Sequence, residues 1–477
     1  MPAPSNETAR IGKIQRVLSH FREHPVGFWF VFWGELAERA SFYGMRTLLT
    51  LYLVDVFRYS DPRSGATAEF FTAACYITPL VGGPIADRLL GKYRTIVWFA
   101  IPYIMGHVIL GNLVTPWGLY IALALLAGGS GAIKPNTSTL MGLIYEKEGK
   151  KELLTEAFSY YYAAINIGAA ITSLALPWVR DVVMHHYLAI PGYTAYMARA
   201  KGFEYALQVP TVLMAVALGV FALGKRHYPE EHIVKVVKTQ EQKEEERGVL
   251  IKLSGLFLMI AFFWFAYDQQ SSTWITFANS HMDLRLWPFN FKLLPDQIQA
   301  FNPVLIVAFT PIFNWMWIEL QRRRGGVAVP DTQKMLAGFY LVIGCVAIMA
   351  VAGFRSAAGP VSVWYILIAT VVVTMAELCV SVVGLEFAFT QATPKTHSTV
   401  TAAFLAMVFV GDGLIGTPFI ERFYDRISMG WFFLVQVFIM IAVVFVFRLI
   451  ARSFEERERV RCAEDAALEA SMERTWS

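Results

Sequence analysis

The sequence predicts an all-α membrane protein whose twelve transmembrane helices form two six-helix bundles. Three observations support this fold class. Of the 477 residues, 56% are hydrophobic and 16% are charged, whereas soluble domains carry about 25% charged residues. Apolar runs of about 20 residues or more recur twelve times along the chain. One long charged break separates the first six runs from the last six.

Each run is long enough to cross a bilayer as a helix. The runs cover 26–57, 66–89, 93–114, 117–145, 154–179, 203–224, 250–279, 297–320, 333–354, 361–392, 397–420 and 430–450. The break after the sixth run is dense in Lys and Glu and cannot bury a hydrophobic face, so we expect a solvated linker. The predicted domains are an arm at 1–25, a bundle at 26–224, a cytoplasmic linker at 225–249, a second bundle at 250–452 and a tail at 453–477.

The Lys and Arg side chains predict the orientation. They cluster before the first run, after the second, fourth, eighth and twelfth runs, and in the linker, which all lie on one side. By the positive-inside rule that side is cytoplasmic. We expect a multi-pass protein of the inner or plasma membrane with both termini in the cytoplasm. Residues 1–24 are too charged for a cleavable signal peptide, and 10–21 fit a surface helix or a disordered arm equally well.

The first run carries four charged residues among apolar ones: Glu35, Glu38, Arg39 and Arg46. At about 100° per residue, they fall with Tyr43 on one side of a helix, within an arc of roughly 140°. A membrane helix tolerates ionisable groups only beside partners or water, so this face should line a cavity. A solvated face of a soluble helix is the alternative, which the composition of the whole chain disfavours.

The fourth run contains a cation inside the membrane. Lys134 precedes Pro135, which removes a backbone donor and should disrupt the helix. A broken helix beside a lysine indicates a cavity. The glycines at 128–131 resemble a phosphate loop but lack its spacing, and close helix packing explains them better.

The fifth run places Phe158, Tyr162 and Asn166 on one helical face, because they are four residues apart. An asparagine at this depth needs hydrogen-bond partners. It either lines the cavity or makes a packing hydrogen bond between helices.

The second half supplies acids that should point inward. Asp268 lies one turn after Trp264, and Glu377 shares a face with Ser381 and Gly384. Buried acids need cations.

The first half offers those cations. Arg46 with Asp268, and Lys134 with Glu377, are the expected pairs across the two bundles. Each pair should form only when the cavity is closed on its side. Two further polar residues, Glu69 in the second run and Asn302 in the eighth, could line the cavity or be structural.

These residues form motifs that resemble those of the proton-coupled oligopeptide transporter (POT) family of the major facilitator superfamily. The motifs lie in both halves, between about residues 35 and 394. They are Glu35-x-x-Glu38-Arg39 with Phe42-Tyr43, Gly82 to Arg88, Phe158-x-x-x-Tyr162-x-x-x-Asn166-x-Gly168, Phe263-Trp264 with Asp268-Gln269, and Glu377 with Ser381, Gly384-Leu385 and Pro394.

The resemblance implies the major facilitator fold and the import of di- and tripeptides, driven by the proton gradient through alternating access, without a cofactor. The positions linked to proton coupling are Glu35, Glu38, Arg39, Lys134, Asp268 and Glu377. The positions linked to peptide binding are Tyr43, Tyr76, Lys134, Asn166, Trp264, Asn302, Glu377 and Ser381. Arg46 and Asp268 take the positions of an extracellular-side gate pair.

The chain departs from the family at several positions. Phe42 and Phe404 stand where many members have tyrosine and tryptophan, so selectivity is expected to shift. Glu69 falls where animal members carry a histidine, and a carboxylate there is a proton site or a spectator. Tyr162 is a further candidate on the fifth-run motif.

Other functions remain as alternatives. A related transporter could carry nitrate, another small anion or a drug in place of peptides. An enzyme or a non-transporting receptor is disfavoured, because no nucleophile with a base, metal cluster or cofactor loop stands out in the sequence. The four cysteines have neither metal nor disulfide spacing. We expect a monomer in the lipid bilayer that binds peptides and protons and no nucleic acid.

Overall fold

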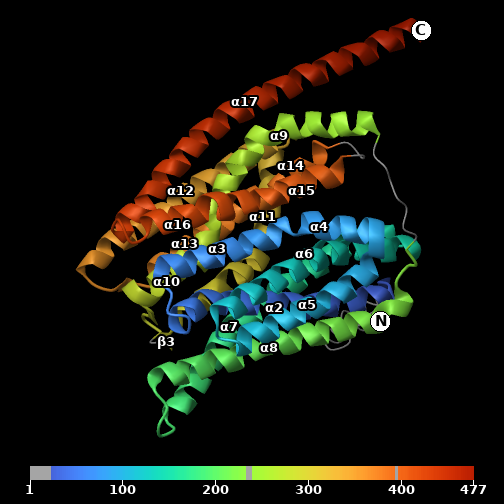
Figure 1. The fold of residues 1–477 in the computed structure, drawn as a ribbon. Helices are drawn as coiled ribbons and strands as arrows, with labels where there is room; N and C mark the ends of the chain where they lie inside the picture. The colour runs from blue at the N-terminus through green and yellow to red at the C-terminus, as the bar shows by residue number, and fades with distance from the viewer. Residues whose placement is uncertain (1–22, 232–238, 290, 393–395, 477) are drawn as a thin grey trace, which may run out of the picture. The chain divides into compact units, whose positions relative to one another are not determined.

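The computed structural model of this chain is almost entirely helical (Figure 1). It describes residues 23–231, 239–289, 291–392 and 396–476. The expectation for residues 10–21 therefore lies outside the described residues. Two compact units make up the chain: unit 1 comprises 1–58 and 77–236, and unit 2 comprises 59–76 and 237–477.

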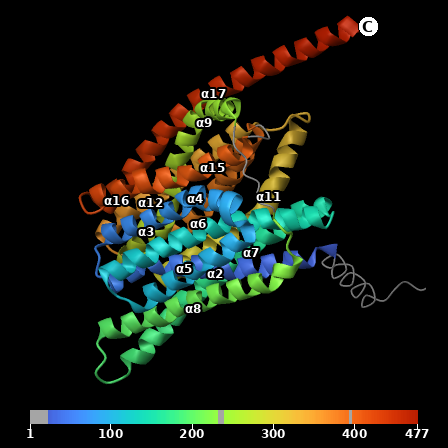
Figure 2. The ribbon, with the colours of Figure 1, turned by 45° about the vertical axis from the view of Figure 1, so that its right-hand side comes forward.

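Unit 1 contains five long helices and several short ones. They are α2 (Val26–Asp55), α4 (Pro79–Ile85), the π-helix η1 (Ala86–Leu90), α5 (Lys92–Asn112), α6 (Pro116–Lys147), η2 (Lys151–Leu153), α7 (Leu154–Leu188), α8 (Ala195–Leu223) and η3 (Gly224–His227). Helix α2 packs against α7 and α8, and α5 packs against α6 and α8. Figure 2 shows α7 and α8 side by side, extending together as a hairpin.

Close packing in unit 1 depends on a glycine. A Cβ on Gly168 of α7 would lie 2.9 Å from the carbonyl oxygen of Leu36 and 3.3 Å from the Cβ of Ala40 on α2. The missing side chain therefore lets the two backbones approach.

The break that we expect at Pro135 of α6 is wrong, because the helix continues through this proline to Lys147. Hydroxyls of Ser138 and Thr139 donate to the Pro135 carbonyl.

Unit 2 contains most of α3 and all elements from α9 onward. They are α3 (Asp61–Ile77), α9 (Gln240–Tyr267), η4 (Asp268–Ser271), α10 (Thr273–His281), β1 (Met282–Asp283), β2 (Arg285–Leu286), β3 (Phe291–Lys292), η5 (Pro295–Ala300), α11 (Phe301–Arg323), α12 (Asp331–Arg355), η6 (Ser356–Ala358), β4 (Val361–Ser362), α13 (Trp364–Glu377), the π-helix η7 (Leu378–Val382), α14 (Val383–Thr390), α15 (His397–Val408), the π-helix η8 (Phe409–Gly416), α16 (Thr417–Phe423) and α17 (Met429–Trp476).

Helix packing and two short strand pairs hold unit 2 together. Helix α12 contacts α13 and α17, and α9 contacts α15, α17 and η8. The strands β1 and β4 pair in parallel, with Met282 opposite Val361. The strands β2 and β3 form an antiparallel hairpin, with Arg285 opposite Lys292. These pairs fix the loops that connect the long helices.

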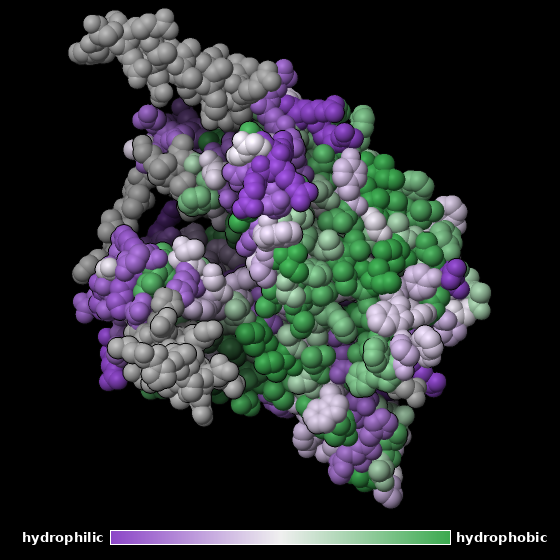
Figure 3. Space-filling model, turned by 180° about the vertical axis from the view of Figure 1, so that it is seen from behind, coloured by the Kyte–Doolittle hydropathy of each residue, from purple (hydrophilic) through white to green (hydrophobic). Residues whose placement is uncertain are grey.

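The fold class is confirmed. Ten helices in the described ranges are long and apolar enough to cross a membrane. The two remaining predicted spans correspond to α2, which carries five charged residues, and to the segmented series α3, α4 and η1. Large hydrophobic side chains are exposed along these helices, and Figure 3 shows a broad hydrophobic area on one face. A lipid environment accounts for such exposure.

The linker is shorter than expected. Helix α9 begins at Gln240, ten residues before the predicted start at 250. A capping box stabilises this start: the Thr239 hydroxyl accepts from the Gln242 amide, and the Gln242 side chain accepts from the Thr239 amide. Residues 240–249 are thus a helical extension of the seventh span.

Candidate functional site

Arg39 is the centre of a buried ionic cluster in unit 1. Glu35, Glu38 and Arg39 lie on α2, and each is only 2% exposed. The Arg39 Nε lies 3.2 Å from the Glu35 Oε1, one helical turn away, and it also pairs with Glu38. Since two acids share one arginine, the three residues carry a net negative charge when all are ionised.

Lys134 of α6 supplies a second cation to this cluster. It lies close enough to Glu35, Glu38 and Tyr43 to interact with them electrostatically. Its side chain is half-buried, as is that of Tyr43. When all four groups are ionised, the two negative charges of Glu35 and Glu38 are thus balanced by the positive charges of Arg39 and Lys134 within unit 1.

Two tyrosines complete the surroundings of the acids, and sequence reasoning missed both. Tyr161 of α7 lies beside Glu35, and Tyr103 of α5 lies beside Glu38. Both side chains are buried. Tyr161 directly precedes the candidate Tyr162, which is exposed, as is Phe158. A helical face drawn through Tyr161 in place of Tyr162 would have identified the buried Tyr161 hydroxyl from the sequence.

A small cavity of about 20 Å³ lies beside Glu35 and Glu38. Its other walls are mostly apolar, with Thr137 of α6 as a polar neighbour. This volume is enough for about one water molecule. A water there would touch the carboxylates that the sequence links to proton coupling.

The remaining unit 1 candidates take different positions. The Phe42 ring lies 5.4 Å from the Arg39 guanidinium carbon, in cation–π contact. Asn166 is buried and donates to the Tyr162 carbonyl of its own helix at 2.9 Å. Arg46, one turn beyond Phe42, is half-buried.

Glu377 is the centre of a hydrogen-bonded group in unit 2. Its Oε2 accepts from the Tyr267 hydroxyl at 2.5 Å and from the Asn302 amide at 2.9 Å. The same Asn302 nitrogen lies 3.0 Å from the Thr374 hydroxyl. Helices α9, α11 and α13 thus converge on one carboxylate, and the sequence alone did not identify Tyr267 or Thr374.

Trp264 and Asp268 lie around the end of α9. The Trp264 ring lies 6.5 Å from that of Tyr76, within unit 2. Asp268 is 3% exposed and begins the 3-10 segment η4. Ser381 lies in the π-helix η7 and is half-buried.

The two remaining unit 2 candidates are buried. Glu69 is 1% exposed, and its Oε1 accepts from the Ser272 hydroxyl at 2.5 Å. Phe404 packs against the Phe257 ring and against Gly384. Glu69 is therefore part of a buried polar contact, and Phe404 is part of the packed core.

Asp61, ahead of the predicted second span, has a perturbed carboxyl. Burial raises the pKa of Asp61 above its usual value, and the nearby Asp425 raises it further. The Ser280 hydroxyl, 3.4 Å away, and His281 act in the opposite direction. This cluster makes the stability of unit 2 sensitive to pH.

Each unit thus assembles its own candidates, while the pairs Arg46 with Asp268 and Lys134 with Glu377 join residues of different units and stay predictions. In the described part of the chain, no group of three or more His, Cys, Asp or Glu side chains is placed to hold a metal ion.

Similar proteins include curated peptide transporters. The family described as "PTR2: POT family" matches residues 93–237 and 229–417. "Peptide transporter 3" of Caenorhabditis elegans is 30% identical over 70% of this chain and 52% of its own length. "Solute carrier family 15 member 2" of Homo sapiens is 30% identical over 68% of this chain and 48% of its own length. The chain therefore spans about half the length of these relatives.

Solved structures share the fold. The crystal structure of the POT family transporter PepTSo matches with a TM-score of 0.75 and 24% identity, covering 91% of this chain and 99% of that one. A POT family transporter in complex with 5-aminolevulinic acid matches with a TM-score of 0.78 and 18% identity, covering 90% and 97%.

Proposed function

We propose that this chain, which belongs to the POT family, imports di- and tripeptides together with protons by alternating access. The buried cluster of Glu35, Glu38, Arg39 and Lys134 is the observation that carries the proposal. Its two acids and two bases balance when all are ionised. A proton taken up by either acid leaves one positive charge in excess, which a peptide carboxylate could neutralise. Proton and peptide would then bias the same conformational equilibrium.

Unit 2 offers a complementary charge for the other end of a peptide. Glu377, held by Asn302 and Tyr267, is suited to bind an amino group. We assign the peptide carboxylate to Lys134, with Arg39 nearby. Asn166 would support the amino end.

Other candidates would contact the middle of the peptide. We propose that Tyr43 and Tyr76 contact the peptide backbone and that Trp264 borders an apolar pocket for the peptide side chains. Ser381 would make a further polar contact. Phe42, Tyr162 and Phe404 are proposed to tune side-chain preference.

We also propose a gate pair and an orientation of the chain in the membrane. Arg46 and Asp268 would act as the extracellular-side gate pair, and Asp268 and Glu377 would share in proton coupling with the unit 1 cluster. Glu69 is either a proton site or structural. We place the chain as a monomer in the inner or plasma membrane with both termini in the cytoplasm, driven by the proton gradient without a cofactor.

The test is the internal pH of proteoliposomes that contain the purified chain. Added dialanine should acidify the lumen, and an inward proton gradient should drive its accumulation. Dialanine should compete with a labelled dipeptide, whereas nitrate should not. Proton flux with nitrate but not with dialanine would overturn peptide transport in favour of anion transport, and no flux with either would overturn proton-coupled transport.

A further inference from the structure

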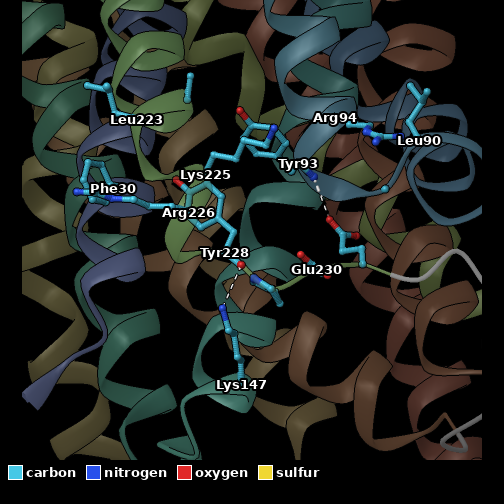
Figure 4. A pocket seen from close by; sticks show the side chains of 14 residues that line it. Phe30, Leu90, Tyr93, Arg94, Lys147, Leu223, Lys225, Arg226, Tyr228 and Glu230 are labelled. Carbon is cyan, nitrogen blue, oxygen red and sulfur yellow. Dashed lines mark hydrogen bonds between the residues drawn. The ribbon is translucent and has the colours of Figure 1, made fainter.

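Unit 1 contains a second cavity, which the proposed function does not use (Figure 4). Its volume is about 1430 Å³. It is lined by residues from η1, from the ends of α2, α5, α6 and α8, from η3 and from the segment that follows η3. Four of the lining residues are cationic: Arg94, Lys147, Lys225 and Arg226.

Among the residues that the structure describes, no carboxylate forms an ion pair with any of these four cations. Lys147 instead donates to the Tyr228 carbonyl at 3.2 Å, and the Lys225 ammonium lies 5.6 Å from the centre of the Tyr93 ring. The cavity therefore concentrates positive charge from three separate segments.

Two acids also line the cavity, but one of them is already engaged. The Glu231 carboxylate accepts from the backbone amides of Lys92 at 2.7 Å and Tyr93 at 3.1 Å, at the start of α5. Glu230 is exposed. With four cations and two acids, the cavity carries a net positive charge.

The cavity lies where two candidate membrane spans end. The span Lys92–Asn112, which is α5, begins at Lys92, and the span Ala195–His227, which is α8 with η3, ends at His227, next to the cationic residues. Leu90 and Leu223 also line the cavity, and Leu223 is 72% exposed. Tyr93 and Tyr228 are aromatic residues of the kind that favours the membrane interface. Cationic and exposed apolar surfaces thus meet at one place.

We propose that this cavity binds the phosphodiester headgroup of an anionic phospholipid. The guanidinium groups of Arg94 and Arg226 can each offer two parallel N–H donors to phosphate oxygens. Leu90 and Leu223 would contact the first part of an acyl chain. The positive-inside distribution assigns this end of unit 1 to the cytoplasm, so the lipid would come from the inner leaflet.

Native mass spectrometry of the full chain in detergent, titrated with dioleoylphosphatidylglycerol, tests the proposal. Each cation near a membrane surface contributes about fivefold to the binding of an anionic lipid. The double variant Arg94→Gln with Arg226→Gln should therefore bind this lipid about 25-fold more weakly. The matched control Arg322→Gln with Arg323→Gln loses the same charge outside the cavity and should bind like the unmodified chain.

A third variant should have the opposite effect on lipid binding. Glu230→Gln removes a negative charge from the cavity wall and should strengthen lipid binding, a result that a folding defect would not produce. Equal binding by the double variant and its control would overturn the site. Inorganic phosphate at millimolar concentration should not displace the lipid, because it lacks acyl chains. Displacement by phosphate would overturn the lipid as the source of the anion.

Discussion

Replacing Glu377 with glutamine should remove the charge that we propose binds a peptide amino group, while keeping the local structure. Both hydrogen bonds from Tyr267 and Asn302 end on the same Oε2. A glutamine can present its carbonyl oxygen at that position, so both donors stay satisfied. The substitution therefore tests the charge of residue 377 and leaves the packing of α9, α11 and α13 in place.

The expected loss follows from the value of a charged hydrogen bond. Such a bond contributes about 1.5–3 kcal/mol. This corresponds to about 10- to 150-fold in the dissociation constant of dialanine. N-acetyl-dialanine has no ammonium group, so its affinity for Glu377→Gln should be close to its affinity for the unmodified chain.

Equilibrium binding of both peptides to purified protein provides the assay. The matched control is Tyr267→Phe, which removes one hydrogen bond but keeps the Glu377 charge. The control should still prefer dialanine over N-acetyl-dialanine, whereas Glu377→Gln should lose that preference. If Glu377→Gln kept the preference for dialanine, or weakened the binding of both peptides equally, Glu377 would not be the residue that binds the amino group.

Three further perturbations test other parts of the structure. Glu35→Gln and Glu38→Gln should each abolish uphill dialanine uptake in proteoliposomes but retain counterflow, because each removes a proton acceptor without emptying the peptide site; full gradient-driven uptake by both would contradict this. Asp61→Asn should raise the thermal unfolding midpoint near neutral pH, because the raised pKa of Asp61 means that folding disfavours its charged form. That gain should decrease as the pH falls and vanish below about pH 3, where the carboxyl is mostly protonated in the folded and unfolded chain alike, and a gain independent of pH would refute the assignment. Gly168→Ala should lower the midpoint through overpacking of about 1–3 kcal/mol, whereas Gly219→Ala, with no neighbouring atom within 4 Å, should not; equal shifts would argue against the close approach of α2 and α7.

The helices could be predicted from the sequence because hydrophobic length is a local property. In the first half, α2 ends at Asp55, against a predicted 57, and α6 ends at Lys147, against 145. Other limits differ more: α7 continues nine residues beyond the predicted 179, to Leu188, and α8 begins at Ala195, eight residues before the predicted 203. The start of α9 at Gln240 lies outside the apolar run that predicts the seventh span, because residues 240–247 are charged or polar. Its local sequence signal is the capping box of Thr239 and Gln242.

Partners of the charged residues were harder to predict, because they depend on distant segments. Spacing placed Glu35 and Glu38 on one face with Arg39, but it gave no reason to select Tyr103 from α5. The contact between Glu69 and Ser272 joins residues 203 positions apart. Neither composition nor periodicity encodes such a pairing; only the packing of helices determines it.

The π-helical turns of η7 explain why helical periodicity fails to predict which residues share a face around Glu377. On a straight α-helix, Glu377 and Gly384 would share a face, since seven residues complete about two turns. The π-helix η7 lies between them, and its wider turns rotate the residues that follow. Glu377 accordingly meets Asn302 of α11, whereas Gly384 packs against Phe404 of α15. The seven-residue spacing of the motif therefore separates one residue that can bind a ligand from one that allows close helix packing.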